Sequence, residues 1–171
     1  NEAAFYGGSF TGLDMDLQEE LFKPVDKLLQ EGIIGSVRLS TRPDYIDGER
    51  LALLKKHNVS TVELGVQSLD DSVLELAGRG HNAASVVKAV ELLRAHGFKT
   101  GLQLMCGMPG QTEASFMETI AESIALKPNM VRLYPLLVIK DTPLEETYRS
   151  GKFTPLGVED AAELCAAALQ K

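Results

Sequence analysis

The stretch Thr61–Gln67, TVELGVQ, carries the alternation that decides the fold. Successive side chains of a strand point to opposite faces of a sheet, so this stretch has one apolar face and one polar face. A strand covered by helices on both faces would be apolar throughout. We therefore expect helices on one face only and a polar interior on the other. The apolar positions are Val62, Leu64 and Val66, and the polar or small positions are Glu63, Gly65 and Gln67.

Four more segments are predicted as strands, and helical patterns separate them. Repeated βα units indicate a parallel sheet with right-handed crossovers. A complete eightfold barrel usually needs ~250 residues, and this chain has 171. The sequence therefore predicts an α/β fold of about five parallel βα units, curled into a partial barrel. The other strands are expected at Ala3–Gly7, Val37–Ser40, Lys99–Cys106 and Met130–Leu136.

The helices are predicted from apolar spacing and from capping residues. The first begins at about Asp16 and ends at Gly32, with Pro24 inside it, so we expect a kink or a break there. Its apolar stripe is read as Leu17, Leu21, Val25 and Leu28. The next five helices are expected to begin at the capping residues Asp47, Asp70, Asn82, Thr112 and Thr142, and the last helix covers Val158–Gln170. The helix after Thr112 has Phe116, Ile120 and Ile124 on one apolar stripe. Thr142 and Glu145 have the form of a capping box.

Composition excludes several classes of protein. The net charge of −7 and the pI near 5.0 argue against a dominant nucleic-acid-binding surface. No apolar run approaches the ~20 residues that span a bilayer, so no membrane partner is expected. Two distant cysteines, Cys106 and Cys165, suggest neither a disulfide framework nor a metal site. A reducing cytoplasm is the simplest setting.

The carboxyl ends of the strands are where parallel βα folds bind ligands. In this chain those ends carry glycines, amides and hydroxyls, as in Gly7-Gly8-Ser9. No nucleophile–base pair is present, which argues against a hydrolase triad. The pattern predicts a site for a polar, zwitterionic or nucleoside-like ligand.

Five motifs in order resemble the radical S-adenosylmethionine (SAM) superfamily, in particular its Elongator-type and oxygen-independent coproporphyrinogen III oxidase branch. That resemblance implies a (β/α)6 partial barrel of which this chain would hold about five units. The motifs are Phe5–Thr11 (FYGGSFT), Leu39–Asp44 (LSTRPD), Glu63–Ser68 (ELGVQS), Arg79–His81 (RGH) and Gly107–Thr112 (GMPGQT).

The resemblance implies roles for nine residues in binding SAM. The backbone of Gly7, Gly8 and Ser9 would hold the methionine amino group, and Ser40 stands where relatives place an acidic residue near that group. Arg79 would bind the methionine carboxylate, because a guanidinium forms a fork to it. The ribose would be bound by Gln67 and Gln103, and the adenine would lie between Met105 and Leu137.

Enzymes of this family hold a [4Fe–4S] cluster with a Cys-x3-Cys-x2-Cys loop after the first strand. This sequence has no such spacing of cysteines, so no metal ligand is assigned. Cys106 has the same strand parity as Leu104, so its side chain is expected to face the helices and not the barrel interior. We therefore expect residues 1–171 to be a partial barrel truncated at the N-terminus, with the first βα unit and its cluster loop missing, and a truncation at the C-terminus is left open. On its own the chain should be unable to reduce SAM.

By resemblance, the intact protein would be an oxidoreductase that cleaves SAM to a 5′-deoxyadenosyl radical, which abstracts a substrate hydrogen. The substrate is left open between a tetrapyrrole and an RNA base, and no catalytic residue is assigned. One alternative is a SAM- or nucleoside-binding module without redox chemistry. Another alternative is an unrelated phosphate-binding barrel. Such barrels often build their site from a second glycine-rich tip late in the chain, and this sequence has none. Open sheet edges also favour self-association.

Charged residues at interior positions of the strands have a different expected role. Arg38, Glu63 and Arg132 share the polar parity on three strands. Charges inside a barrel usually pair with each other, so we expect a structural ion-pair cluster. His81, close to the rim, is interpreted as structural.

Overall fold

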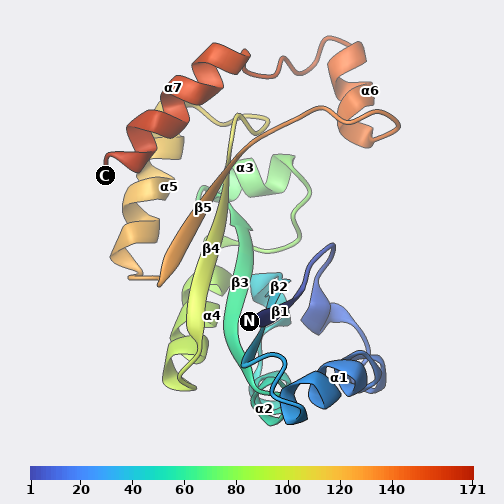
Figure 1. Cartoon of the computed structure of the whole chain (residues 1–171). Helices are drawn as coiled ribbons and strands as arrows, with labels where there is room; N and C mark the ends of the chain where they lie inside the picture. The colour runs from blue at the N-terminus through green and yellow to red at the C-terminus, as the bar shows by residue number, and fades with distance from the viewer.

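Five parallel strands form one curled sheet in the computed structural model, which describes all residues from 1 to 171 (Figure 1). The strand order β1-β2-β3-β4-β5 follows the chain, as expected for consecutive right-handed βα units. The predicted partial (β/α) barrel is therefore confirmed, and every strand lies within two residues of its predicted bounds. These strands are β1 (Glu2–Phe5), β2 (Ser36–Thr41), β3 (Val59–Gln67), β4 (Lys99–Cys106) and β5 (Met130–Pro135).

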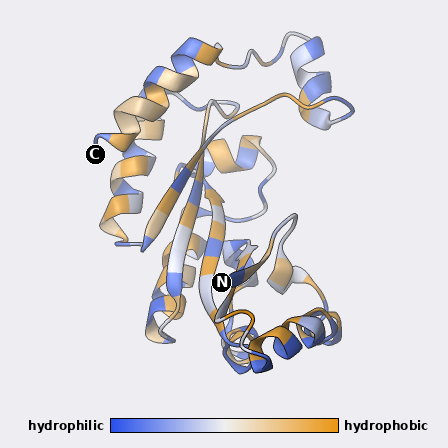
Figure 2. Ribbon diagram, in the orientation of Figure 1, coloured by the Kyte–Doolittle hydropathy of each residue, from blue (hydrophilic) through white to orange (hydrophobic).

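Seven α-helices and two short 3-10 turns connect the strands. The larger helices pack against the apolar positions of the strands, so that Leu39, Leu64 and Leu104 are fully buried. Figure 2 shows apolar and polar bands alternating along β3. The helices are α1 (Met15–Gln30), α2 (Gly48–Lys56), α3 (Asp71–Leu76), α4 (Ala83–Ala95), α5 (Glu113–Ala125), α6 (Pro143–Arg149) and α7 (Val158–Leu169), with the turns at Phe10–Gly12 and Pro43–Tyr45.

The helix caps follow the sequence closely. Asp47 and Asp70 accept backbone N–H groups of their own first turns, and Asn82 and Thr112 form reciprocal capping boxes. At α6, Thr142 accepts from the Glu145 N–H, but the Glu145 carboxylate bonds to the Asp141 N–H instead of closing the box. That half of the predicted capping box is wrong.

The apolar face of α1 agrees with the predicted one at Val25, which is buried, but differs at its first two leucines. Leu17 and Leu21 are 43% and 37% exposed, whereas Phe22 and Gln18 are fully buried. Phe22 makes aromatic contacts with Phe5, Phe10 and His57, and this large buried ring sets the orientation of the helix. The helix also continues through Pro24, so the break proposed there does not occur. On α5 the predicted stripe is shorter as well, since Phe116 and Ile120 are buried but Ile124 is 46% exposed.

Cys106 lies on the helix-facing side of β4, as its parity predicted. Its Sγ is 3.4 Å from the Sγ of Cys165 on α7, and both are free thiols. Burial and the neighbouring thiol raise the pKa of Cys106 to about 12. Both thiols are therefore on the face opposite the barrel interior. No helix is long and apolar enough to cross a membrane.

Candidate ligand-binding rim

A buried carboxylate organises the interior face of the sheet. Glu63 on β3 is fully buried and accepts four groups: Tyr6 Oη at 2.7 Å, Arg38 Nη1 at 3.0 Å, Gln103 Nε2 at 3.0 Å and Arg132 Nε at 3.1 Å. The ion pairs of Glu63 with Arg38 and Arg132 confirm the predicted cluster, and Tyr6 and Gln103 extend it. We call these five residues the Glu63 cluster.

Electrostatics show that this cluster is internally satisfied. Burial alone would raise the pKa of Glu63, but the bonds from Tyr6 and Gln103 and the charges of Arg132 and Arg38 lower it overall. Burial and the bond to this carboxylate raise the pKa of Tyr6. A buried charge with this many partners is typical of a structural element.

Gln67 ends β3 in an irregular conformation. Its φ is +68°, and the register with β4 shifts between Gly65 and Gln67, which marks a bulge. The side chain is buried, and its Oε1 has no hydrogen-bond partner. A buried acceptor without a partner is costly, so it indicates a site for a donor from outside the chain.

Arg79, in the α3–α4 turn, lies next to Gln67 and is also only partly satisfied. Its Nη2 donates to the Gly65 carbonyl at 3.3 Å, while its buried Nε has no partner, and no carboxylate pairs with it. Burial lowers the pKa of Arg79, and the nearby Arg42 lowers it further. A Cβ at Gly65 would lie 3.3 Å from Gln67 Nε2 and 3.6 Å from Arg79 Nη2, so the glycine makes room for both. A desolvated guanidinium without a counter-ion is suited to a carboxylate.

Gln67 and Arg79 line a cavity of about 600 Å³, and Met105 lines it as well. The structure thus brings together three of the nine predicted residues: Gln67, Arg79 and Met105, which we call the rim site. The rest of the wall is mostly apolar and includes Leu76, Met108, Leu136, Leu144 and Phe153.

Leu137, predicted beside the adenine, is not brought to this cavity. It is 71% exposed, and Leu136 lines the cavity instead. The strand ends at Pro135, and the Leu136 N–H bonds to the Cys106 carbonyl, so the alternation of β5 does not continue to Leu137. Sequence reasoning missed Leu136 and Phe153, because they lie in irregular segments without periodicity.

Gly7, Gly8 and Ser9 lie at the β1 end of the rim. They border a separate hollow of about 330 Å³ that Phe5 and Phe10 also line. Gly7 has a φ of +103°, which favours glycine. Ser40 is brought to this segment, since its Oγ donates to the Gly8 carbonyl at 3.4 Å.

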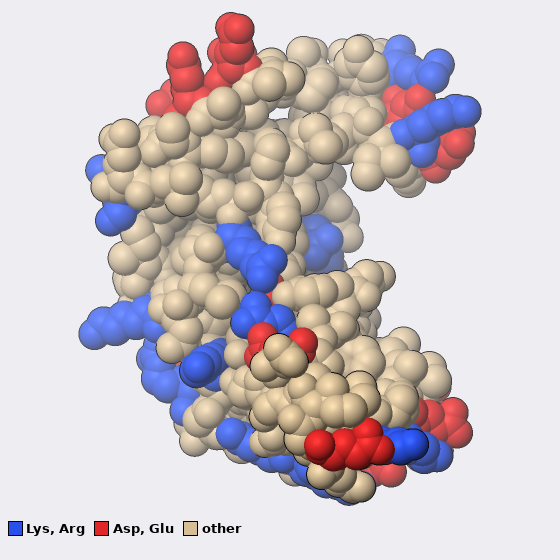
Figure 3. All heavy atoms as spheres, viewed as in Figure 1, with Lys and Arg blue, Asp and Glu red and all other residues tan.

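Eight of the nine predicted residues therefore fall into three groups rather than one, and Leu137 belongs to none of them. Gln103, the remaining one, belongs to the Glu63 cluster through its Nε2. Figure 3 shows a notch between α6 and the β1–α1 end, with basic side chains on its floor. The rim site and the glycine segment thus flank an open concave face.

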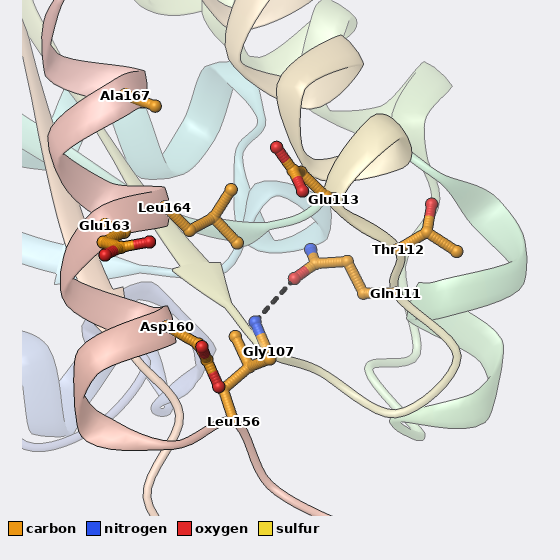
Figure 4. Close-up of a pocket in the computed structure, with 9 residues that line it drawn as sticks. All are labelled: Gly107, Gln111, Thr112, Glu113, Leu156, Asp160, Glu163, Leu164 and Ala167. Atoms are coloured by element: carbon orange, nitrogen blue, oxygen red, sulfur yellow. Dashed lines mark hydrogen bonds between the residues drawn. The ribbon is translucent and has the colours of Figure 1, made fainter.

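A further hollow of about 370 Å³ lies between α7 and the start of α5 (Figure 4). None of the predicted residues lines it. Gln111 points there, but its Oε1 accepts the N–H groups of Gly107 and Met108, so it serves the β4–α5 turn. The chain also has no group of three or more His, Cys, Asp or Glu side chains placed to hold a metal ion.

Comparisons with protein families cover nearly the whole chain. Residues 2–122 match the model of the Radical SAM superfamily, and residues 128–171 match the Radical_SAM C-terminal domain.

Similarity to curated proteins agrees with these two family matches. A tRNA uridine(34) acetyltransferase of Methanocaldococcus jannaschii is 37% identical over 129 residues, which is 74% of this chain and 24% of that protein. The heme chaperone HemW of Bacillus subtilis is 28% identical over 160 residues, or 92% of this chain and 42% of that protein. The chain therefore spans less than half of the length of these relatives.

Solved structures extend the likeness to the fold. Elp3 of Methanocaldococcus infernus superposes with a TM-score of 0.90 at 30% identity, over 98% of this chain and 44% of that one. Coproporphyrinogen III oxidase (HemN) of Escherichia coli has a TM-score of 0.77 over 99% of this chain and 39% of that one. At 19% identity, the second likeness concerns the fold alone.

Proposed function

The chain belongs to the radical SAM superfamily, whose members use SAM and a [4Fe–4S] cluster, and on that premise we propose that its rim site binds SAM. In the whole protein, the bound cluster would supply the electron that cleaves SAM to methionine and a 5′-deoxyadenosyl radical. That radical would abstract a hydrogen atom from the substrate. The names of the relatives leave a nucleobase of tRNA and a heme-related molecule as substrate classes.

One observation carries the proposal: a half-buried guanidinium without a counter-ion and an amide oxygen without a partner both line one mostly apolar cavity. Arg79 would receive the methionine carboxylate, which replaces the counter-ion that the protein does not provide. Gln67 Oε1 would accept from a ribose hydroxyl. Met105 and the apolar wall suit the adenine face.

The amino end of SAM would extend toward the glycine segment. Gly7 and Gly8 have no atom within 4 Å of the position of a Cβ, so a ligand can approach their backbone. Ser40 would contribute a neutral contact beside the Gly8 carbonyl. Gln103 would accept from the ribose through its Oε1, because its Nε2 already donates to Glu63.

The residues of this chain do not fit the iron–sulfur cluster. Cys106 and Cys165 are two thiols only, and they lie against each other on the helix-facing side of β4. Three thiolates on the interior side would be needed. We assign no ligand of the cluster to residues 1–171.

Calorimetric titration of the 171-residue chain with S-adenosylhomocysteine tests the site without any need for the cluster. We expect binding that Arg79→Ala and Gln67→Ala each weaken about tenfold or more. Arg149→Ala is the matched control, since this exposed arginine bonds only to Glu145 on α6. Binding that is unchanged by both rim substitutions would overturn the site.

A second measurement separates redox chemistry from simple binding. The full-length protein, reconstituted anaerobically with iron and sulfide and then reduced, should convert SAM to 5′-deoxyadenosine, which chromatography detects. Retained binding of S-adenosylhomocysteine with no cleavage by the reconstituted protein would favour the non-redox module instead.

A further inference from the structure

The end of β3 adopts a conformation that must be held from outside the strand. Gln67 has a φ of +68°, in the left-handed region, and the ladder with β4 is interrupted just before it. For a residue with a side chain this conformation costs about 1–2 kcal/mol. Such strain persists only where the surroundings enforce it.

Two side chains from one short segment bind the carbonyls next to this bulge. Arg79 Nη2 donates to the Gly65 carbonyl at 3.3 Å, and His81 Nε2 lies 3.1 Å from the Val66 carbonyl. Gly80 between them has a φ of +72°, and a Cβ there would lie 2.7 Å from Arg42 Nη2. Only a glycine thus lets the segment turn tightly enough for both neighbours to reach β3.

The contact with Val66 fixes the protonation of the imidazole. A carbonyl only accepts, so Nε2 carries the proton and Nδ1 in the neutral ring is unprotonated. Nδ1 is buried and has no partner, so a second proton there would be an unsatisfied donor. Burial lowers the pKa of His81, which outweighs the effect of the bond to Val66.

The charges around the ring come from three elements. Arg79 and Arg42 oppose a positive imidazole, whereas Asp44 favours it. Asp71 and Glu75 on α3 border a surface hollow that His81 also lines. Asp44 is already paired with Arg42, so it offers His81 little compensation.

From this geometry we propose that neutral His81 is a positioning residue, which holds the bulge at Val66 so that Gln67 presents its free Oε1 to the cavity. The inference rests on the proposed SAM site. Without the bond to Val66, the strand relaxes toward regular β geometry and the Gln67 amide leaves its place over Gly65. Ligand affinity is then lost although His81 does not line the cavity itself.

Substitutions that move or remove the donor test this role, with S-adenosylhomocysteine as the probe. His81→Gln keeps an N–H at the place of Nε2, whereas His81→Asn places it nearer to Nδ1. We expect His81→Ala and His81→Asn to raise the Kd about tenfold and His81→Gln to stay within about threefold of the wild type. His96→Gln, at the exposed C-terminal end of α4, is the matched control.

The pH dependence supplies a readout that a merely structural role would not change. Wild-type affinity should fall as the pH is lowered from 7.5 to 5, because protonation turns the buried Nδ1 into a donor without an acceptor and displaces the ring from Val66. The His81→Gln variant should bind with a flat profile over this range. Equal profiles for the two proteins, or equal Kd values for all His81 variants, would overturn the proposal.

Nuclear magnetic resonance tests the inference without a ligand. Long-range ¹H–¹⁵N spectra should show the Nε2–H tautomer of His81, and the Gln67 backbone amide should shift in His81→Ala but not in His81→Gln. An Nδ1–H tautomer would contradict the proposal. If the ¹H–¹⁵N results hold but S-adenosylhomocysteine does not bind, the proposed function fails and the positioning role stands.

Discussion

The Glu63 cluster and the rim site each have one member on β3, Glu63 and Gln67, yet the hydrogen bonding of the two groups is opposite. Glu63 has four donors around its carboxylate, drawn from β2, β4, β5 and Tyr6, the residue after β1. Four residues further along β3, Gln67 Oε1 and the neighbouring Arg79 Nε are buried without any partner. Both regions hold polar groups in the interior of a partial barrel. Only the rim site keeps a buried acceptor and a buried donor without hydrogen-bond partners.

The contrast teaches how to tell structure from function among buried polar residues. Burying a charge is costly unless it is paired, so a saturated carboxylate contributes to holding strands together. A buried group without partners lowers stability, and its retention points to a ligand. The predictions below test this division, from the largest expected effect to the smallest.

Removing the centre of the Glu63 cluster should cost the most stability. Glu63→Leu leaves Arg38 and Arg132 without their buried counter-ion, and we expect the free energy of unfolding to fall by about 3 kcal/mol. Urea denaturation followed by circular dichroism measures it. A loss below about 1 kcal/mol would mean that the arginines regain water fully and that the cluster is not structural.

Removing the cation of the rim site should have little effect on stability and a large effect on ligand affinity. Arg79→Ala should change the free energy of unfolding by no more than about 1 kcal/mol, because one long bond to the Gly65 carbonyl is lost but no ion pair. Affinity for S-adenosylhomocysteine should fall by about 2 kcal/mol, or roughly 30-fold. Arg79→Lys retains the charge without the fork and should lie in between. A strongly destabilised Arg79→Ala protein that binds normally would reverse the comparison.

Acid should weaken the Glu63 cluster selectively. The pKa of Glu63 is lowered in the folded chain, so its contribution is complete above the ordinary value of 4.5 and is lost as the pH falls through the folded value. Between wild type and Glu63→Gln, the slope of unfolding free energy against pH should differ in the range below 4.5 by at most about 1.4 kcal/mol per pH unit. Identical slopes would show that Glu63 titrates normally.

The smallest effect is expected at the edge of the cluster. Tyr6 is 51% exposed, and its hydroxyl donates to Glu63 at 2.7 Å. Tyr6→Phe removes one of four donors and should cost about 1 kcal/mol in the same urea experiment. A loss as large as that of Glu63→Leu would show that Tyr6, not the arginines, stabilises the carboxylate.

Part of this division was predictable from the sequence. The alternation of Thr61–Gln67 places Glu63 and Gln67 on the interior face, and charges of opposite sign on neighbouring strands predict the ion pairs. The capping residues likewise fix helix starts, because Asp, Asn and Thr bond to N–H groups within three residues of themselves. These are local or periodic properties, so a single sequence expresses them.

Other features required contacts between distant segments. The orientation of α1 depends on where Phe22 meets Phe5 and Phe10, and this contact overrides the leucine stripe. The cavity wall at Leu136 and Phe153 belongs to irregular chain, for which no period exists. The glycine segment and the rim site also border two separate hollows, which the order of residues along the chain does not reveal.

The sequence by itself determined the parallel βα order, the polar interior face and the residues that stand at the strand ends, because strand parity, caps and glycines are written locally. Only the tertiary structure decided which of the polar residues are satisfied. Whether Glu63 meets four donors, or Gln67 Oε1 and Arg79 Nε meet no partner, depends on residues brought together from several strands of the sheet and from the α3–α4 turn. Hydrogen bonds act over about 3 Å, so function here is set by distances that no spacing in the chain contains.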